Sequence, residues 1–311
     1  MNKILISASM SEIAQNTFKK NNIDVDVNTN LSDQEIIKII ANYDGLIVRS
    51  ATTVNKNIIQ AASKLKIIGR AGAGVDNIDL VEAKKNNIVV MNTPGANANA
   101  TAEHTLTLML SLIRNIPFAN STTHKGQWEK KSIKGMELSN KTIGIIGYGN
   151  VSARLINLLK GFNVKILVYS TSIKERNDIV PEITISSLDE VITNCDVLTF
   201  HCKSPKDGKP ILNIESMKKM KSTAIIVNAA RGNVIDENDL NTALNDNLLA
   251  GAAIDVFSKE PAKSNILFNN PKIILTPHIA ASTKESQINV AKMISEQVSD
   301  YLINNKSINT V

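Results

Sequence analysis

A glycine-rich turn in the middle of the chain has the residues needed to bind a dinucleotide. The segment 142–146 is apolar and β-branched, a helical pattern of leucine and isoleucine follows from residue 155, and between them stands Gly147-Tyr148-Gly149-Asn150-Val151-Ser152. The first glycine permits a tight turn, and the second lets the backbone approach a pyrophosphate. The helix N-terminus then offers free N–H groups to the phosphates. We therefore predict a dinucleotide site at Gly147, Gly149, Asn150 and Val151; a plain strand-to-helix turn is the alternative.

Two departures from the usual dinucleotide fingerprint bear on this site. Ser152 replaces the third glycine, where a small residue is needed for packing of the helix on the strand. The next strand, 164–168, runs into Tyr169-Ser170-Thr171-Ser172 instead of ending in the carboxylate that binds the ribose of NAD, and Lys174 and Arg176 follow. The absence of a carboxylate predicts that NADP is accepted at least as readily as by many NAD-type sites. Alternatively, Ser170 bonds the ribose hydroxyls of NAD and the two cations are plain surface.

The composition is that of an ordinary globular protein. The 311 residues are 43% hydrophobic and 21% charged, and a prior of about 150 residues per domain suggests two domains. The net charge of +6 comes from scattered lysines, with aromatic residues at only 4%, so we predict no nucleic-acid partner. A solvated surface or a modest attraction for anionic small molecules explains this charge.

We expect no membrane segment and a cytoplasmic location. The longest apolar run, 106–113, is far shorter than the ~18 residues that a membrane span needs. Residues 1–7 are typical of a first strand rather than a signal peptide. Cys195 and Cys202 are too few for a disulfide framework, and free thiols in a reducing compartment are the simpler interpretation.

Short β-branched segments alternate with helical patterns along almost the whole chain, which predicts doubly wound α/β architecture with parallel sheets. The expected strands are 3–7, 23–27, 45–48, 66–69 and 88–91, then 142–146, 164–168, 196–200, 224–228, 251–255 and 273–276. The expected helices lie near 12–20, 32–41, 55–62, 78–85, 99–114 and 283–304, with Pro117 breaking the helical pattern that begins at 99. The turn-forming stretch 92–99 is the expected hinge between two units.

Three segments at predicted strand ends carry a family resemblance: 228–232 (Asn-Ala-Ala-Arg-Gly), 255–261 (Asp-Val-Phe-Ser-Lys-Glu-Pro) and 276–280 (Thr-Pro-His-Ile-Ala). They resemble the D-2-hydroxyacid dehydrogenase family, and most closely its D-3-phosphoglycerate dehydrogenase branch. The resemblance extends over nearly the whole chain. It includes segments 46–50, 69–79, 92–97, 102–105, 114–117 and 281–285.

The resemblance implies a Rossmann-type dinucleotide-binding domain, residues 98–280, inserted into a flavodoxin-like substrate-binding (catalytic) domain formed by residues 1–97 and 281–311. It also implies a homodimer formed through residues 98–140, or a homotetramer. Long members of the branch carry regulatory domains after the final helix. Because the sequence ends at Val311, we expect neither such a domain nor feedback control by serine through it.

The resemblance also assigns roles in hydride transfer. Arg231 would grip the substrate carboxylate and carbonyl oxygens, His278 would exchange the hydroxyl proton, and Glu260 would orient His278 and favour its protonated form. Taken singly, these residues could be a surface arginine, a turn glutamate and a structural histidine. The expected cofactor contacts beyond the glycine turn are Tyr169, Ser170, His201, Ala229, Ala230, Asp255 (at the nicotinamide carboxamide) and Ala280.

For the substrate, the resemblance places the backbone of Ala73, Gly74 and Val75 at the carboxylate. Arg49, with Ser50 after it, and Arg70 follow predicted strands and would bind a phosphate. Lys130 and Lys131 could add to phosphate binding from a partner subunit or be a solvated pair.

The expected reaction is NAD(P)-dependent oxidation of 3-phospho-D-glycerate to 3-phosphohydroxypyruvate, the first step towards serine. A glyoxylate or hydroxypyruvate reductase, or another D-2-hydroxyacid dehydrogenase, is the alternative enzyme. A nucleotide-sensing corepressor is the alternative outside enzymes.

The remaining histidines have weaker signals. His201 ends strand 196–200 and would border the cofactor, whereas the run 202–209 departs from the family pattern near the adenine. His104 lies on an apolar helical stretch and is typical of a satisfied core or interface histidine, and His124 stands in a polar segment. No second ligand pair has metal-binding spacing with His201 and Cys202, so we predict no metal.

Overall fold

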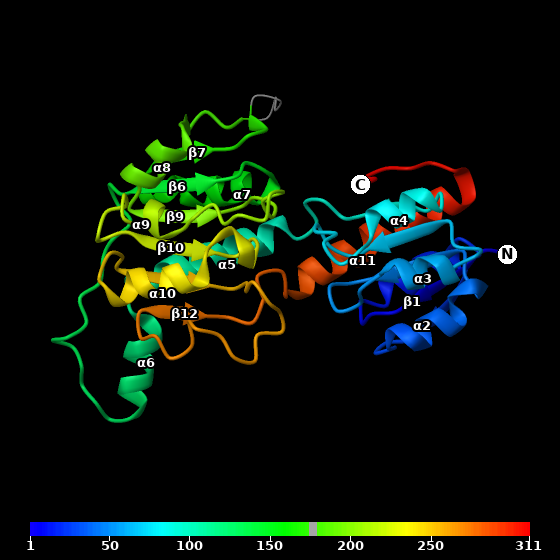
Figure 1. Ribbon diagram of the computed structural model, residues 1–311, viewed down its shortest axis with the longest axis horizontal. Helices are drawn as coiled ribbons and strands as arrows, with labels where there is room; N and C mark the ends of the chain where they lie inside the picture. Colours follow the sequence, from blue (N-terminus) through cyan, green and yellow to red (C-terminus); the bar gives the residue numbers. More distant parts are fainter. Residues whose placement is uncertain (174–178) are drawn as a thin grey trace. The chain divides into compact units, whose positions relative to one another are not determined.

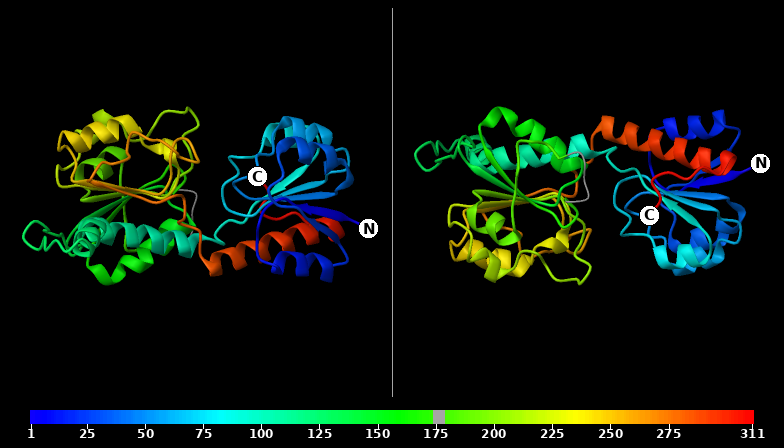
Figure 2. Two further views of the ribbon diagram at one scale, coloured as in Figure 1. Left: turned by 90° about the horizontal axis from the view of Figure 1, so that it is seen from below. Right: turned by 90° about the horizontal axis from the view of Figure 1, so that it is seen from above.

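The computed structural model describes residues 1–173 and 179–311, and the chain divides into two compact units. Residues 1–97 and 282–311 form unit 1, and residues 98–281 form unit 2. The second boundary therefore falls one residue later than the sequence analysis placed it, because Ala281 belongs to unit 2. Each unit is a parallel sheet with helices on both faces, so the predicted fold class is confirmed (Figures 1 and 2).

Unit 1 contains a five-stranded sheet in the order β2-β1-β3-β4-β5, which is the flavodoxin-like order. Its strands are β1 (Lys3–Ile6), β2 (Asp24–Val27), β3 (Gly45–Val48), β4 (Ile67–Arg70) and β5 (Val89–Met91). Its helices are α1 (Ile13–Lys20), α2 (Asp33–Ile39), α3 (Lys56–Ala61), α4 (Leu80–Lys85) and α11 (Lys284–Asn304). The C-terminal helix α11 thus completes a unit that the N-terminal segment begins (Figure 1).

The two faces of this sheet bury separate apolar clusters. Leu46 and Val48 of β3 pack on the side of α2, α3 and α4, and Ile47 packs on the side of α1 and α11. All four residues of β3 are buried, as expected for a central parallel strand covered on both faces. Gly69 of β4 lets α11 approach closely, because a Cβ there would lie 3.0 Å from side-chain atoms of Ile294 and Val298.

Unit 2 contains a seven-stranded parallel sheet in the order β12-β11-β10-β9-β6-β7-β8. Its strands are β6 (Thr142–Ile146), β7 (Lys165–Tyr169), β8 (Thr184–Ile185), β9 (Val197–Phe200), β10 (Ile225–Asn228), β11 (Gly251–Ile254) and β12 (Ile273–Leu275). Its helices are α5 (Ala98–Ile113), α6 (Ile116–His124), α7 (Asn150–Leu159), α8 (Leu188–Asn194), α9 (Ile214–Met217) and α10 (Glu237–Asn245). The order is that of a Rossmann domain, and its switch point lies between β6 and β9.

Helix α5 packs with α7 on one face of this sheet, and α8, α9 and α10 cover the other. The predicted long helix ends at Ile113, as expected, but Pro117 does not end the helical structure. It stands in the first turn of α6, where a missing N–H costs no intrahelical bond. The strand β8 was not predicted, because it has only two residues and both are exposed.

Over the described residues, the structure has no helix that is both long and apolar enough to cross a membrane.

Candidate active site

The glycine turn of unit 2 joins β6 to α7 and has the geometry of a dinucleotide fingerprint. Gly147 has φ of +96°, and a Cβ there would lie 2.6 Å from the carbonyl oxygen of His201. Gly149 faces open space within the described part of the chain. The first turn of α7, with Asn150 and Val151, follows directly, so its N–H groups are available to an anion.

Ser152 stabilises this turn more than its small size alone predicted. Its buried hydroxyl donates to the carbonyl of Gly147 at 2.7 Å and accepts the N–H of Gly149 at 3.3 Å. A serine at the third fingerprint position therefore links the two glycines of the turn.

The end of β7 presents hydroxyl groups. Tyr169 is the last residue of the strand, and its carbonyl accepts the N–H of Gly147 at 2.7 Å. Ser170 follows, with its Oγ 3.4 Å from Oγ of Ser172. Lys174 and Arg176, the two cations of the NADP prediction, lie outside the described residues.

Arg231 stands on a tight turn after β10, and Asn228 shapes this turn. The buried Asn228 side chain donates from Nδ2 to the carbonyl of Arg231 at 2.9 Å and accepts the N–H of Ala230 at 3.0 Å. At Gly232 a Cβ would lie 1.9 Å from the carbonyl carbon of Phe257, so only glycine allows the two loops to touch. The role of Asn228 was missed; its signal is an asparagine that can bond its own backbone two residues on.

His278 and Glu260 form a close pair. Nδ1 of His278 lies 2.6 Å from Oε2 of Glu260, whose Oε1 accepts the N–H of Phe257 at 2.9 Å. This hydrogen bond raises the pKa of His278 above its usual value. Burial alone would raise the pKa of Glu260, but the bonds from His278 and from the N–H of Phe257 hold it below the usual value.

Two carboxylates hold the loops that carry this pair. Asp255, at the end of β11, is fully buried and accepts the hydroxyl of Thr276 and the N–H groups of Ile279 and Ala280. Glu237, at the start of α10, accepts the N–H and hydroxyl of Ser258 and the side-chain amide of Asn265. Ser258 precedes Glu260 in the loop, and Asn265 follows it. Sequence reasoning missed Glu237, because its partners are 21 and 28 residues away. The contact of Asp255 with a carboxamide stays a prediction.

His201 lies directly after β9, beside the side chain of Thr199. Its Nε2 lies 3.2 Å from Oγ of Thr199, and burial lowers the pKa of the imidazole to about 4. Burial likewise raises the pKa of the neighbouring Cys202 thiol to about 11. Across residues 1–173 and 179–311 there is no group of three or more histidine, cysteine or acidic side chains that could hold a metal ion.

The predicted substrate residues of unit 1 gather at the carboxyl ends of β3 and β4. Val48 pairs with Arg70 in the parallel ladder, so Arg49, the next residue after β3, and Arg70 start from neighbouring strand ends. Nη1 of Arg49 donates to the carbonyl of Ser9 at 3.0 Å. Ser50 follows Arg49 and is exposed.

The loop after β4 packs beneath one of these arginines. Nη1 of Arg70 fills the space where a Cβ of Gly72 would lie. The carbonyl of Ala73 accepts the side-chain amide of Asn92 at 2.6 Å, and the carbonyl of Val75 accepts the N–H of Ile78. With Gly74 between them, these residues form a short loop at the strand end where parallel sheets bind ligands.

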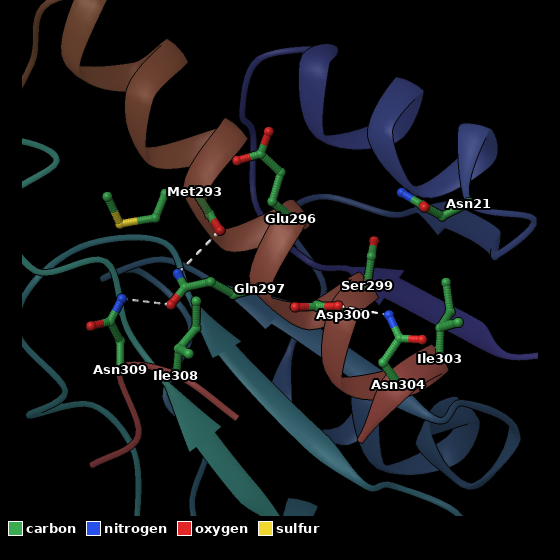
Figure 3. Close-up of a pocket in the computed structure, with 10 residues that line it drawn as sticks. All are labelled: Asn21, Met293, Glu296, Gln297, Ser299, Asp300, Ile303, Asn304, Ile308 and Asn309. Atoms are coloured by element: carbon green, nitrogen blue, oxygen red, sulfur yellow. Dashed lines mark hydrogen bonds between the residues drawn. The ribbon is translucent and has the colours of Figure 1, made fainter. Parts of the chain in front are cut away.

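A separate hollow of unit 1 contains none of the predicted site residues. It lies between α11, the end of α1 and the C-terminal tail (Figure 3). Thr310 of this tail pairs antiparallel with Met91. Gln297, which lines the hollow, bonds Asn309 of the tail at 2.7 Å.

Residues 106–280 match the sequence pattern described as "D-isomer specific 2-hydroxyacid dehydrogenase, NAD binding domain". The chain belongs to the D-isomer specific 2-hydroxyacid dehydrogenase family. The predicted family and the predicted cofactor, NAD, are thereby confirmed, and the glycine turn lies in the NAD-binding domain of the family.

Among its relatives in this family, the chain is 41% identical over 303 residues to the D-3-phosphoglycerate dehydrogenase of Synechocystis, covering 97% of this chain and 54% of the relative. It is 40% identical over 298 residues to that of Archaeoglobus fulgidus, covering 95% and 56%. The chain therefore spans about half the length of the curated relatives that it matches. The crystal structure of cofactor (NAD+)-bound 3-phosphoglycerate dehydrogenase of Entamoeba histolytica superposes with a TM-score of 0.84 at 31% identity, covering 100% of this chain and 98% of that one.

Proposed function

We propose that this protein is an NAD(P)-dependent D-2-hydroxyacid dehydrogenase that interconverts 3-phospho-D-glycerate and 3-phosphohydroxypyruvate. The 2.6 Å pair of His278 and Glu260 carries the dehydrogenase part of the proposal, because it supplies a proton-exchanging group with a tuned pKa. The names of the relatives at 40–41% identity carry the choice of substrate.

When bound at the glycine turn, a nicotinamide cofactor would supply the hydride acceptor for C2 of the substrate. Neutral His278 takes the hydroxyl proton on Nε2, since Glu260 occupies Nδ1, and the carboxylate stabilises the imidazolium that results. In reduction, protonated His278 returns the proton. Arg231 grips the carboxylate and carbonyl oxygens with its planar fork.

Unit 1 serves as the substrate-binding domain and unit 2 as the dinucleotide-binding domain. The backbone of Ala73, Gly74 and Val75 binds the substrate carboxylate, and Arg49 and Arg70 bind the phosphate. The support for this assignment is their common origin at the ends of β3 and β4.

The cofactor contacts extend from the glycine turn to Tyr169, Ser170, His201, Ala229, Ala230, Asp255 and Ala280. These residues occupy or follow the ends of β7, β9, β10, β11 and β12, the edge of the sheet at which dinucleotides bind. The proposed location is the cytoplasm, where both cysteines stay reduced, as they are here.

The proposed assembly is a homodimer or homotetramer formed through residues 98–140. Three large apolar side chains of this region are exposed in the single chain: Ile116 (52%), Phe118 (51%) and Trp128 (82%). A second copy would cover such a surface. Light scattering on the purified protein distinguishes the assembled from the monomeric state.

The deciding experiment is reduction of 3-phosphohydroxypyruvate by the purified protein, with NADH and NADPH in parallel. We expect fast turnover with the phosphorylated substrate and much slower turnover with hydroxypyruvate and glyoxylate. Turnover with hydroxypyruvate or glyoxylate alone would assign the protein to the reductase alternative. Cofactor binding without turnover on any 2-oxo acid would contradict an enzymatic role.

A further inference from the structure

A histidine outside the proposed catalytic pair faces the turn that carries His278. His104 lies on α5, the first helix of unit 2, and its side chain is 17% exposed. Its Nε2 lies 3.3 Å from Oγ of Thr276 and 3.5 Å from Oδ1 of Asp255. His104 was expected to be a satisfied core or interface histidine, and Thr276 and Asp255 are the groups that satisfy it.

The turn 276–280 is built on Asp255. Thr276 donates its hydroxyl to Oδ1 at 2.6 Å, and the N–H groups of Ile279 and Ala280 bond the same carboxylate at 2.9 and 3.0 Å. The N–H of His278 donates to the carbonyl of Asp255 at 2.8 Å. His278 has φ of +54°, a left-handed conformation that a residue other than glycine keeps only when its surroundings hold it.

The donors and acceptors around Thr276 determine which hydrogen bond His104 can make. The hydroxyl of Thr276 has one proton and gives it to Asp255, so its oxygen faces His104 as an acceptor. Nε2 of His104 must therefore carry a proton and donate. Both the neutral and the protonated imidazole can make this bond, and in either form it ends on the residue that begins the turn.

We propose that His104 is a positioning residue for His278. It acts through Thr276 and Asp255 to hold the 276–280 turn, in which His278 has a left-handed backbone conformation. The inference rests on the proposed function, because that function gives His278 the proton-exchanging role. The charged groups that act on His278 are Glu260, Asp255 and Arg231, and Asp255 is the acidic group that faces His104. A turn released from His104 would move the imidazole of His278 away from Glu260.

The chain has only four histidines, so histidine-selective ¹⁵N NMR can follow the titration of each one without any turnover. We expect His104→Leu to lower the pKa of His278 by about 0.5 unit or more, because its bond to Glu260 lengthens. In His104→Gln the side-chain amide can place a donor near the same point, so the pKa of His278 should return most of the way to its wild-type value. The exposed His124→Gln serves as the matched control and should leave the pKa of His278 unchanged.

A double-mutant cycle tests the route through Thr276. Thr276→Val removes the hydroxyl and keeps the shape, and we expect it to change the pKa of His278 as His104→Leu does. The double variant should add little to either single change, since the two residues act in one chain of bonds. These variants also keep the test decisive if His104→Leu does not fold.

The outcomes separate this inference from the proposed function. If the pKa of His278 in His104→Leu equals that of the wild type, the positioning role is wrong, whatever the activity. If the pKa falls and is restored by glutamine, the role stands even when 3-phosphohydroxypyruvate is not a substrate.

With an active enzyme we further expect kcat for reduction to fall about three- to tenfold in His104→Leu, with the KM for NADH unchanged. A role in stability alone would lower Tm without moving the pKa of His278.

Discussion

One carboxylate, that of Glu260, bonds both the imidazole of His278 and the backbone of its own loop. Oε2 lies 2.6 Å from Nδ1 of His278, and Oε1 accepts the N–H of Phe257 at 2.9 Å. The second bond fixes the carboxylate, so the first can fix the orientation of the imidazole. Glu260 raises the pKa of His278, which widens the pH range over which the protonated imidazole persists.

The first prediction concerns the pH dependence of catalysis. In the proposed mechanism reduction requires protonated His278, so its rate should fall as the pH rises through the raised pKa of His278. Oxidation requires the neutral form, and its rate should rise through the same pKa. Glu260→Gln removes the charge that favours the imidazolium, so both transitions should move to lower pH by about 1 unit. The measurement is kcat/KM against pH in both directions. The exposed neighbour Lys259→Gln is the control, and unchanged transitions in Glu260→Gln would contradict this role.

The second prediction separates folding from cofactor binding at two glycines. In Gly147→Ala the new Cβ would lie 2.6 Å from the carbonyl oxygen of His201, at a φ of +96°, so we expect a loss of about 2 kcal/mol or more in stability and a lower Tm. In Gly149→Ala the Cβ meets no atom within 4 Å among the described residues, so Tm should not change. Its methyl would still keep a pyrophosphate away, and the Kd for NADH should rise about tenfold or more.

Thermal unfolding and fluorescence titration with NADH measure these two effects independently. Gly161→Ala, at another glycine with no described atom within 4 Å, is the control for both. If Gly149→Ala binds NADH as tightly as the wild type, the fingerprint does not hold the phosphates.

The third prediction tests the phosphate-binding role of Arg49 and Arg70. Replacing either with glutamine removes charge-assisted hydrogen bonds, so KM for 3-phosphohydroxypyruvate should rise about 10- to 100-fold. KM for hydroxypyruvate, which has no phosphate, should stay within about threefold. Arg154→Gln, on the exposed side of α7, controls for the loss of one positive charge. Equal losses with both substrates would mean that the two arginines act on structure or on the carboxylate.

The sequence was sufficient for the fold because the central strands are buried on both faces. Segments 45–48 (Gly-Leu-Ile-Val) and 225–228 (Ile-Ile-Val-Asn) are apolar except for the final Asn228, and each strand was predicted to within a residue of its observed bounds. The exceptions are local. Residues 184–185 form a strand too short and too exposed to give a pattern. Pro117 was expected to break a helical stretch, although it lies in the first turn of α6.

The site was only partly predictable, because its supporting bonds join residues distant in sequence. Motif positions indicated Arg231, Glu260 and His278, but not the partners that hold their loops. Glu237 bonds Ser258 across 21 residues, and Asp255 bonds Ala280 across 25, and no periodicity reports such contacts. His104 likewise meets Thr276 across 172 residues, so only the folded chain shows that it faces the turn of His278.

The last prediction addresses cofactor choice at the end of β7. Ser170, with its hydroxyl 3.4 Å from that of Ser172, stands where a dinucleotide site selective for NAD has a carboxylate. Because a hydroxyl does not repel a 2′-phosphate, we expect the wild-type Kd for NADPH to lie within about tenfold of that for NADH. Ser170→Asp should raise the Kd for NADPH about tenfold or more and leave that for NADH equal or lower, since a carboxylate repels the phosphate but bonds the ribose hydroxyls.

Ser170→Asn, which has the same size as aspartate without its charge, is the control, and fluorescence titration with both cofactors is the measurement. A wild type that binds NADPH far more weakly than NADH, with Ser170→Asp changing neither, would mean that Ser170 bonds the ribose hydroxyls of NAD and does not admit NADP.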